Sequence, residues 1–362
     1  MKIAKHFLLS AAVVTALIVQ ADAKVWRVNN MGYEADFAQV SQAVADPNVL
    51  PGDTLHVEGS SVEYNGAAIS KSLVIIGAGY FLLENPKTTN NGLATNIGWI
   101  TFNSGSENSQ LIGLSVNSPS GISISTNNIS VKRCKIIYYI DLYYNINNIT
   151  IVQNYFENNS ASSTTSAIGV SPSSFPTNVR FNNNILRRPL VIIDNPTYAF
   201  LECNNNVFDL AALPSSGPSL RFYAASFKNN ILVNNAASVK INGITDFTTT
   251  PNAAVSHNIG SSSVVHFGTA NNNAVVSNMT ANLFVPAAGA STDGKYQLKA
   301  GSPGSSNGSD GTDRGVFGGG AVSSRYILSG LAPIPVIYEI STTGVATPST
   351  GLNVTIKARI VE

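Results

Sequence analysis

Three charged residues recur at one place in a repeated sequence phrase. Glu157, Arg187 and Asp209 each stand three positions after the marker residue of an aligned segment. If these segments stack as neighbouring strands, adjacent members of the column lie about 5 Å apart. Arg187 could then grip the carboxylate of an anionic sugar while the two acids act beside it. A cross-strand ion ladder is the competing interpretation, and the alternating charge signs favour it.

A second group combines cations with aromatic rings. Lys132 and Lys135 lie shortly before Tyr139 and Tyr143. Aromatic faces stack on sugar rings and lysines pair with uronates, so these residues could form a glycan-binding platform. Tyrosine is also a good strand former, and charges on a solvated turn are ordinary. Both interpretations stay open.

A Gly/Ser-rich stretch near the end of the chain carries oxygen ligands. Asn307, Asp310 and Asp313 could hold calcium, although their spacing does not match regular calcium loops. Asn and Asp in such stretches usually make turns. The sequence therefore assigns no metal site and predicts no cofactor, with calcium as the one possibility.

The elements that would position these residues follow from a repeat. Seven segments end in a marker residue followed by mostly apolar residues, at intervals of 20 to 30 residues: Cys134, Asn154, Asn184, Asn206, Asn230, Asn258 and Asn282. Apolar positions alternate with period two, as in Ile149-Ile151 and Val179-Phe181. This period predicts an all-β, right-handed parallel β-helix, a solenoid with three short strands in each coil.

The repeated asparagine has a structural explanation. Asparagine tolerates left-handed backbone angles at a tight turn, and stacked copies can bond their amides from coil to coil. We therefore expect an internal asparagine ladder at the marker positions. This register places Cys134 and Cys203 in different columns, two or more coils apart, so a disulfide between them is not expected.

The ends of the repeat are expected to be capped, because open coils expose strand edges. Helical spacing over 36–44 predicts an N-terminal capping helix. Residues 300–320 are expected to close the other end, and Val336–Ile340 with Leu352–Ile360 to form a terminal hairpin. The predicted division is a signal peptide at 1–23, a capped β-helix domain at 24–325 and a C-terminal hairpin extension at 326–362.

The first residues predict export. Lys2 and Lys5 precede an apolar run and then Ala21-Asp22-Ala23, the order of a cleaved secretory signal. The run from Phe7 to Val19 is shorter than the ~20 residues that span a bilayer, which disfavours a membrane span. We expect a secreted or cell-surface protein.

Composition limits the partners. Charged residues make up 11% of the chain and the net charge is +1, so little counterion-release energy is available for nucleic acid. No nucleic-acid partner is expected. A surface of Asn, Ser, Thr and Gly suits neutral hydrogen-bonding partners such as polysaccharide, and it equally suits no partner.

Several phrases carry a family resemblance. The amphipathic segment leading into "PGDTLHVEG", the phrase "SLVIIGAGYFL", the "NNNIL"-type turns and the final "AGSP...GTDRGVFGG" resemble secreted bacterial members of the pectate-lyase-like β-helix superfamily. The resemblance covers roughly residues 25 to 320. It implies the fold and raises the expectation of a polysaccharide partner, but it assigns no chemistry. The Gly-His-Gly motif of its polygalacturonases does not occur in this chain.

Three functions remain from the sequence. The first is an extracellular protein that contacts polysaccharide or a surface through one long face, without catalysis. The second is a lyase or glycosidase on an acidic glycan that uses Arg187, Glu157 and Asp209. The third is a purely structural extracellular protein. Catalysis and the oligomeric state are undecided.

Overall fold

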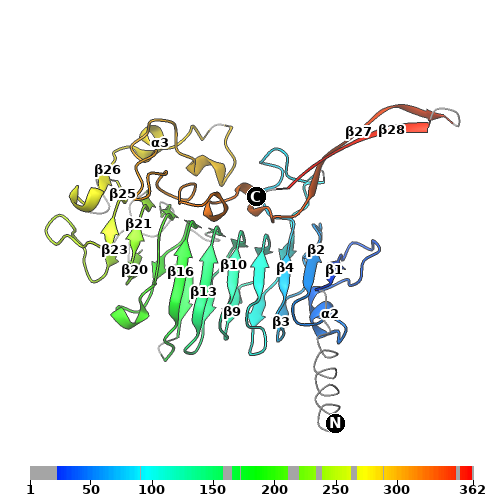
Figure 1. The fold of residues 1–362 in the computed structure, drawn as a ribbon, viewed down its shortest axis with the longest axis horizontal. Helices are drawn as coiled ribbons and strands as arrows, with labels where there is room; N and C mark the ends of the chain where they lie inside the picture. Colours follow the sequence, from blue (N-terminus) through cyan, green and yellow to red (C-terminus); the bar gives the residue numbers. More distant parts are fainter. Residues whose placement is uncertain are drawn as a thin grey trace, which may run out of the picture.

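The chain folds as short parallel strands with few helices. The computed structural model describes residues 23–89, 91–157, 165–171, 173–210, 220–233, 239–261, 267–287, 289–347 and 351–360. In these residues the structure is mostly β, with several parallel sheets, and is consistent with a parallel β-helix (Figure 1). The predicted signal peptide lies almost wholly outside the described residues.

Sheet A contains seven strands in the described ranges. In spatial order these are β1 (Val25–Val28), β2 (Thr54–Val57), β4 (Val74–Ile76), β7 (Gln110–Ile112), β10 (Ser130–Lys132), β13 (Asn147–Val152) and β16 (Thr177–Asn182). All pairings are parallel; Val131, for example, pairs with Leu111 on one side and Ile151 on the other.

Sheet B is longer, with nine strands in the described residues. In spatial order these are β5 (Asn96–Ile97), β8 (Ser115–Val116), β11 (Lys135–Ile136), β14 (Tyr155–Phe156), β17 (Ile185–Leu186), β19 (Val207–Phe208), β22 (Ile231–Leu232), β25 (Ile259–Gly260) and β26 (Ala274–Val275). Each of these nine strands has only two residues.

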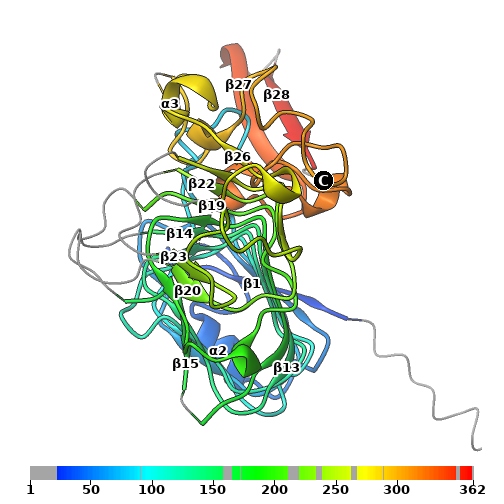
Figure 2. The same cartoon turned by 90° about the vertical axis from the view of Figure 1, so that its left-hand side faces the viewer.

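Sheet C has five strands in the part of the chain that is described. They are β3 (Ala67–Ile69), β6 (Ile100–Phe102), β9 (Ile122–Ile124), β12 (Ile140–Leu142) and β15 (Ile168–Val170). Between β4 and β17 the chain passes from sheet A to sheet B to sheet C and back again (Figure 2). Two smaller parallel sheets follow, one of β18 (Leu190–Val191), β20 (Leu220–Phe222) and β23 (Val239–Ile241), and one of β21 (Phe227–Lys228) and β24 (Val255–Ser256).

The main core lies between the sheets. Alternating residues of the strands in sheets A and C are buried, such as Leu111, Val131 and Ile151 of sheet A, because successive side chains of a strand point to opposite faces. Phenylalanines from successive coils also meet inside: the ring centroids of Phe156 and Phe181 are 5.6 Å apart.

The asparagine ladder forms, with two corrections. Backbone N–H groups at Cys134, Asn154, Asn184, Asn206, Asn230 and Asn258 each donate to the side-chain oxygen of the next rung. The last rung is Asn273, only 15 residues after Asn258, and not the predicted Asn282. Asn282 instead ends helix α3 (Met279–Asn282).

The second correction concerns the backbone. Left-handed angles fall on the residue before each rung, for example Gln153, Asn183 and Asn205 with φ of 61, 54 and 56°. The preceding residue makes the sharp turn between sheets A and B, and the ladder residue then points inward. A left-handed residue at this turn was therefore predicted correctly, but it is the residue before the ladder asparagine and not the asparagine itself.

This left-handed column holds the end of the chain. Residues 300–332, called the return segment below, run back along the coils (Figure 1). Nδ2 of Asn183 donates to the carbonyls of Val316 and Gly318, and Nη1 of Arg133 donates to that of Leu331. The prediction that residues 300–320 close the far end is wrong, because they lie along the side of the coils.

A second core fills the space between sheet B and its cover. The outer face of sheet B carries five fully buried side chains: Tyr155, Ile185, Val207, Ile231 and Ile259. Their partners include Met279, Leu283, Tyr296, Val316 and Tyr326. The cover contains α3 and the short 3₁₀ turns η3 (Gly294–Tyr296), η4 (Val322–Ser324) and η5 (Leu328–Gly330); two further turns, η1 (Pro196–Tyr198) and η2 (Ala270–Asn272), lie in the coils.

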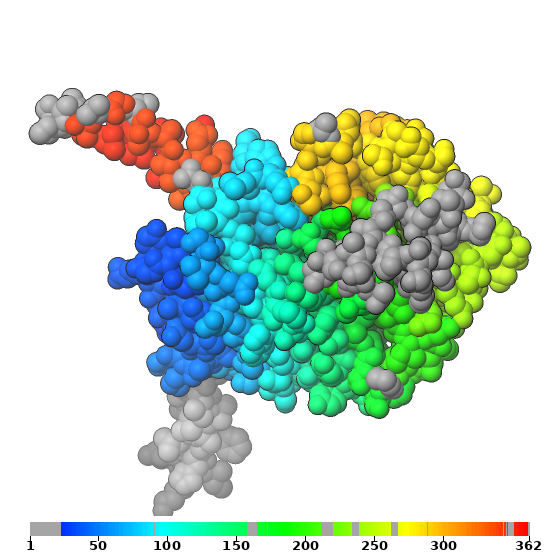
Figure 3. All heavy atoms as spheres, turned by 180° about the vertical axis from the view of Figure 1, so that it is seen from behind, coloured from blue at the N-terminus to red at the C-terminus, as the bar shows by residue number. Residues whose placement is uncertain are grey.

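The terminal elements differ in length from their predictions. Helix α2 covers only Val40–Ala45, because Phe37 forms a bridge with Val28. It buries Val40, Ala43 and Val44 and packs against β1, β2 and β3. The predicted hairpin is confirmed, with longer strands: β27 (Val336–Thr347) and β28 (Gly351–Arg359) are antiparallel and project from the body (Figures 1 and 3).

Candidate functional site

The predicted charged column forms beside sheet B. Glu157, Arg187 and Asp209 directly follow β14, β17 and β19, and the backbone N–H of each donates to the preceding coil. Nη1 of Arg187 lies 3.9 Å from Oε1 of Glu157. The structure thus brings these side chains into neighbouring positions. Their catalytic role stays a prediction.

Both carboxylates of the column have partners. Nζ of Lys135 lies 2.8 Å from Oε2 of Glu157, so that Glu157 sits between two cations. The hydroxyl of Tyr296 donates to Oδ2 of Asp209 at 2.6 Å. Lys135, Glu157 and Arg187 expose only 19 to 28% of their side chains. Alternating charges in this setting form the ion ladder that the charge pattern favours.

Buried tyrosines surround the ladder. Burial raises the pKa of Tyr155, despite the nearby Arg187, and raises the pKa of Tyr296 well above its ordinary value. Burial alone would lower the pKa of Arg187, but Tyr155, Tyr296 and Asp209 outweigh it and raise that pKa. Neither phenol is therefore suited to act as a base at neutral pH, and Arg187 is fixed as a cation.

The predicted sugar platform is divided among three faces. Lys132 belongs to sheet A and Lys135 to sheet B, where its Nζ lies 5.0 Å from the ring centroid of Phe81. Tyr139 and Tyr143 flank β12 of sheet C, and the Tyr143 hydroxyl donates to Asp141. The structure does not bring the four residues together.

A polar groove lies on the outer face of sheet A. It consists of two adjoining cavities of about 450 and about 300 Å³, which share Gln110 and Lys132. One wall of the larger cavity is formed by Ser323 and Ser324 of the return segment and by Pro333, which directly follows it. Its floor is made of outward-facing residues on β7, β10 and β13.

The floor repeats from coil to coil. Asn108, Asn128 and Asn148 stand 20 residues apart at the edge of the groove, with φ of 68, 60 and 60°. Nδ2 of Asn148 donates to Oδ1 of Asn128 at 3.0 Å. The next column contains Gln110, Ser130 and Thr150, again at 20-residue intervals. This spacing of 20 residues is the sequence feature that could have predicted the groove.

The groove is cationic. Nζ of Lys132 donates to Oε1 of Gln110 at 3.3 Å, and burial together with the nearby Arg133 lowers the pKa of Lys132. Neither cavity is lined by an Asp or Glu among the described residues. A half-buried lysine surrounded by amides and hydroxyls attracts an anion and can donate hydrogen bonds to sugar oxygens.

Further along the same face the charges balance. Arg180 of β16 lies 3.6 Å from Glu202, at the next position of the sheet. This ion pair links two neighbouring coils of the same face. Nη1 of Arg180 also donates to Oδ1 of Asn148, which joins this pair to the groove edge.

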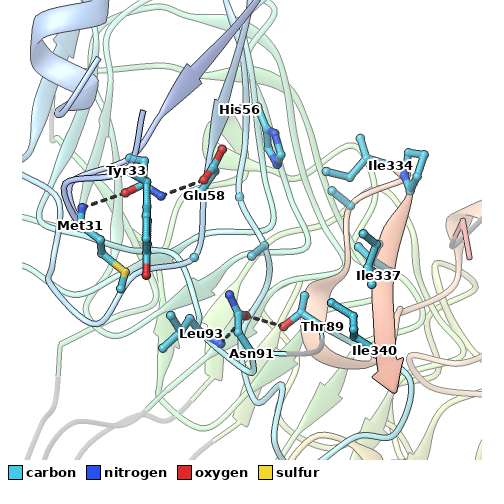
Figure 4. A pocket seen from close by; sticks show the side chains of 17 residues that line it. Met31, Tyr33, His56, Glu58, Thr89, Asn91, Leu93, Ile334, Ile337 and Ile340 are labelled. Carbon is cyan, nitrogen blue, oxygen red and sulfur yellow. Dashed lines mark hydrogen bonds between the residues drawn. The ribbon is translucent and has the colours of Figure 1, made fainter. Parts of the chain in front are cut away.

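A separate cavity lies between the first coils and the hairpin. It has a volume of about 450 Å³ and is mostly apolar, with Met31, Leu93 and Ile337 among its walls (Figure 4). The carboxylate of Glu58 accepts hydrogen bonds from the side chains of Arg27 and Asn29. Burial lowers the pKa of His56. This cavity was not predicted, because its walls come from both ends of the chain.

The possible calcium ligands make turn contacts. Oδ1 of Asp310 accepts from the N–H and hydroxyl of Thr312. Oδ1 of Asp313 accepts from the N–H of Ser306 at 2.9 Å, and Asn307 donates to Pro303. No group of three or more His, Cys, Asp or Glu side chains in the described ranges is arranged to hold a metal ion.

Comparison with known proteins gives no further assignment. No protein-family model and no curated protein matches this sequence. Across the residues that the structure describes, no helix has the length and apolar character needed to cross a bilayer.

Proposed function

We propose that this protein is exported and binds an acidic polysaccharide along the outer face of sheet A, without catalysing its breakdown. The observation that carries the proposal is the groove itself: two adjoining cavities with Lys132 at their junction and no acidic residue among the described residues of their walls. A uronate or sulfate group would pair with Lys132, while amides and hydroxyls would bond the neutral sugar oxygens.

The proposed framework is a right-handed parallel β-helix of the pectate-lyase-like kind, with α2 as its N-terminal cap. The cyclic order of the three sheets and the asparagine ladder support a solenoid. A solenoid repeats equivalent side chains at strand spacing of about 4.8 Å. Repeated contacts of this kind suit a repetitive chain such as a polysaccharide.

The charged column supports binding rather than hydrolysis or elimination. Glu157 is held by Lys135 and Arg187, and Asp209 accepts from Tyr296. A glycosidase needs one carboxyl as a proton donor and another as base or nucleophile. Here both carboxylates are engaged by neighbouring side chains, which leaves the ladder a stabilising role.

The test is binding of the mature chain to acidic and neutral polysaccharides, measured by affinity electrophoresis and calorimetry. We expect polygalacturonate, alginate or a sulfated glycan to bind, and dextran not to bind. Lys132→Gln should weaken binding at least fivefold. The matched control is Lys240→Gln, which removes a lysine paired with Asp194 at 2.6 Å on the small sheet that contains β23.

Three outcomes would contradict the proposal. Equal loss of binding in both variants would indicate nonspecific charge attraction. Release of unsaturated or reducing-end products, abolished by Arg187→Ala, would establish an enzyme at the charged column. Absence of any binding would leave a purely structural role.

A further inference from the structure

The C-terminal hairpin has one apolar and one polar face. In the register of the ribbon Ile340 faces Ile356, and Val354 and Leu352 follow on the same side at alternate positions of β28. The opposite side carries the ion pair of Glu339 and Lys357. Side-chain alternation of this kind is typical of a sheet with one buried face.

In this structure the apolar face is exposed. Ile337, Ile340, Leu352, Val354 and Ile356 have relative exposures between 45 and 58%. The ribbon extends away from the body (Figure 3). A two-stranded ribbon is only marginally stable alone in water, and a contiguous apolar patch of this kind marks an interaction site.

The apolar face continues into the cavity beside the first coils. Ile337 and Ile340 at the base of the ribbon line that cavity together with Ala78 and Leu93 (Figure 4). One apolar surface therefore runs from Leu352 near the tip of the ribbon to a hollow in the body. A partner that covers the face also reaches this hollow.

We propose that this surface binds a second copy of the chain. The two ribbons pack face to face and antiparallel about a twofold axis, and Leu352 of each molecule enters the cavity of the other. A twofold contact needs a patch that complements itself. The ribbon and cavity meet that requirement, because each molecule offers both a protruding apolar tip and an apolar hollow.

Size favours this arrangement over contact between ribbons alone. The nine residues of β28 span about 30 Å, at about 3.4 Å per residue. Two paired strands are about 10 Å wide, so one ribbon face buries roughly 300 Å² when it is covered. A standard interface buries ~800 Å² on each partner. The cavity walls supply additional area, and only an antiparallel partner can use both parts.

The first experiment measures the mass of the mature full chain by sedimentation over a range of concentrations from about 1 to 200 µM. We expect a reversible monomer–dimer equilibrium. Val354→Glu on the apolar face should raise the dissociation constant at least tenfold. Thr355→Glu is the matched control, because it adds the same charge to the neighbouring position on the polar face, and it should leave the dimer intact.

The second experiment tests the arrangement. A mixture of Leu352→Cys and Leu93→Cys chains should form a covalent dimer on mild oxidation, and a mixture of Asn353→Cys and Leu93→Cys should not. A chain that stays monomeric throughout the range, or a dimer that tolerates Val354→Glu, overturns the proposal. Monomers that bind phosphatidylglycerol vesicles through the same face would assign the surface to lipid instead. Circular dichroism checks that each variant retains the fold.

Discussion

The side chains of Asn184 and Asn206 form one rung of a ladder that joins the coils. Oδ1 of Asn206 accepts from the backbone N–H of Asn184 at 2.9 Å and from its Nδ2 at 3.2 Å. Nδ2 of Asn206 donates in turn to the carbonyl of Phe181 and to Oδ1 of Asn230. Every polar atom of this fully buried amide is thus paired, as buried polar groups require.

Removing one rung should be costly. Asn206→Ala leaves the N–H of Asn184 and the carbonyl of Phe181 without their partners. Each unsatisfied buried group costs about 1–3 kcal/mol, so the free energy of unfolding should fall by roughly 3–5 kcal/mol. Urea unfolding followed by circular dichroism measures the change.

The control removes an asparagine from the exposed outer face. Asn148 is left-handed, with φ of 60°, a conformation that glycine adopts easily. Asn148→Gly should therefore change the free energy of unfolding by less than about 1 kcal/mol. Equal effects of the two substitutions would contradict the role of the buried ladder.

Both thiols should be inert in the folded protein. Cys134 occupies the first ladder position and Cys203 belongs to the same main core; both are free and fully buried. Burial raises the pKa of Cys134 to about 12, and that of Cys203 well above its usual range. At pH 8 only about one Cys134 in ten thousand is then a thiolate, the reactive form.

A thiol reagent provides the measurement. Ellman's reagent at pH 8 should detect almost no thiol in the native chain and both cysteines in urea. Rapid reaction of either residue before unfolding would show that the coils open around it. The bonded alternative predicts a different result, because a disulfide would leave no thiol even in urea.

The interior was readable from the sequence because it is periodic. The marker asparagines fixed the coil length and the stacking of Glu157 on Arg187, which the structure reproduces. The prediction of the last rung was wrong because Asn258 is followed by a coil of only 15 residues. An alignment based on intervals of 20 to 30 residues selected Asn282 instead. Variable loop length thus limits register, since a loop leaves no periodic signal.

The cover over sheet B was also signalled, though only in part. Ile185-Leu186 and Val207-Phe208 are consecutive apolar pairs, and both members of each pair are buried. A strand with water on one face needs only one of them apolar. The pairs therefore indicate that both faces are covered, but the cover comes from Tyr80, Phe81 and residues 276–332, which have no repeat to align.

Stability near neutral pH should depend on His56. Burial lowers the pKa of this imidazole, and Arg27 lowers it further, while Glu58 opposes the shift. A lowered pKa means that the unfolded chain binds more protons than the folded chain once the pH falls below about 6.5. The free energy of unfolding should therefore decline from pH 7.5 to 5.5, and decline less in His56→Gln.

Acidic groups give a separate window at lower pH. Burial alone would raise the pKa of Glu58, but hydrogen bonds from Arg27 and Asn29 outweigh it and lower that pKa. Its contribution is present above about pH 4.5 and is lost below. Urea unfolding at pH 7.5, 6.5, 5.5 and 4.0 separates the two effects. Parallel curves for wild type and His56→Gln above pH 5.5 would contradict the assignment to His56.

The last prediction concerns a buried carboxylate that joins Asn85 to the return segment. Oδ1 of Asp293 accepts from Asn85 and Ser291, and Oδ2 accepts from the N–H of Ser329 and the hydroxyl of Tyr326. All four partners donate, and Asp293 is fully buried. In Asp293→Asn an NH₂ group replaces one carboxylate oxygen. This group cannot accept a hydrogen bond from the donors that surround it.

This isosteric change should lower the free energy of unfolding by about 2–3 kcal/mol, the scale of a hydrogen bond to a charged group. Asp313→Asn is the matched control. Among the residues that the structure describes, hydrogen bonds to the Asp313 carboxylate reach Oδ1 alone, from Ser305 and Ser306, and an amide keeps that oxygen. The control should stay within about 0.5 kcal/mol of wild type. Equal stability of both variants would contradict a stabilising role of this carboxylate, because the amide at 293 cannot satisfy the four donors that the carboxylate does.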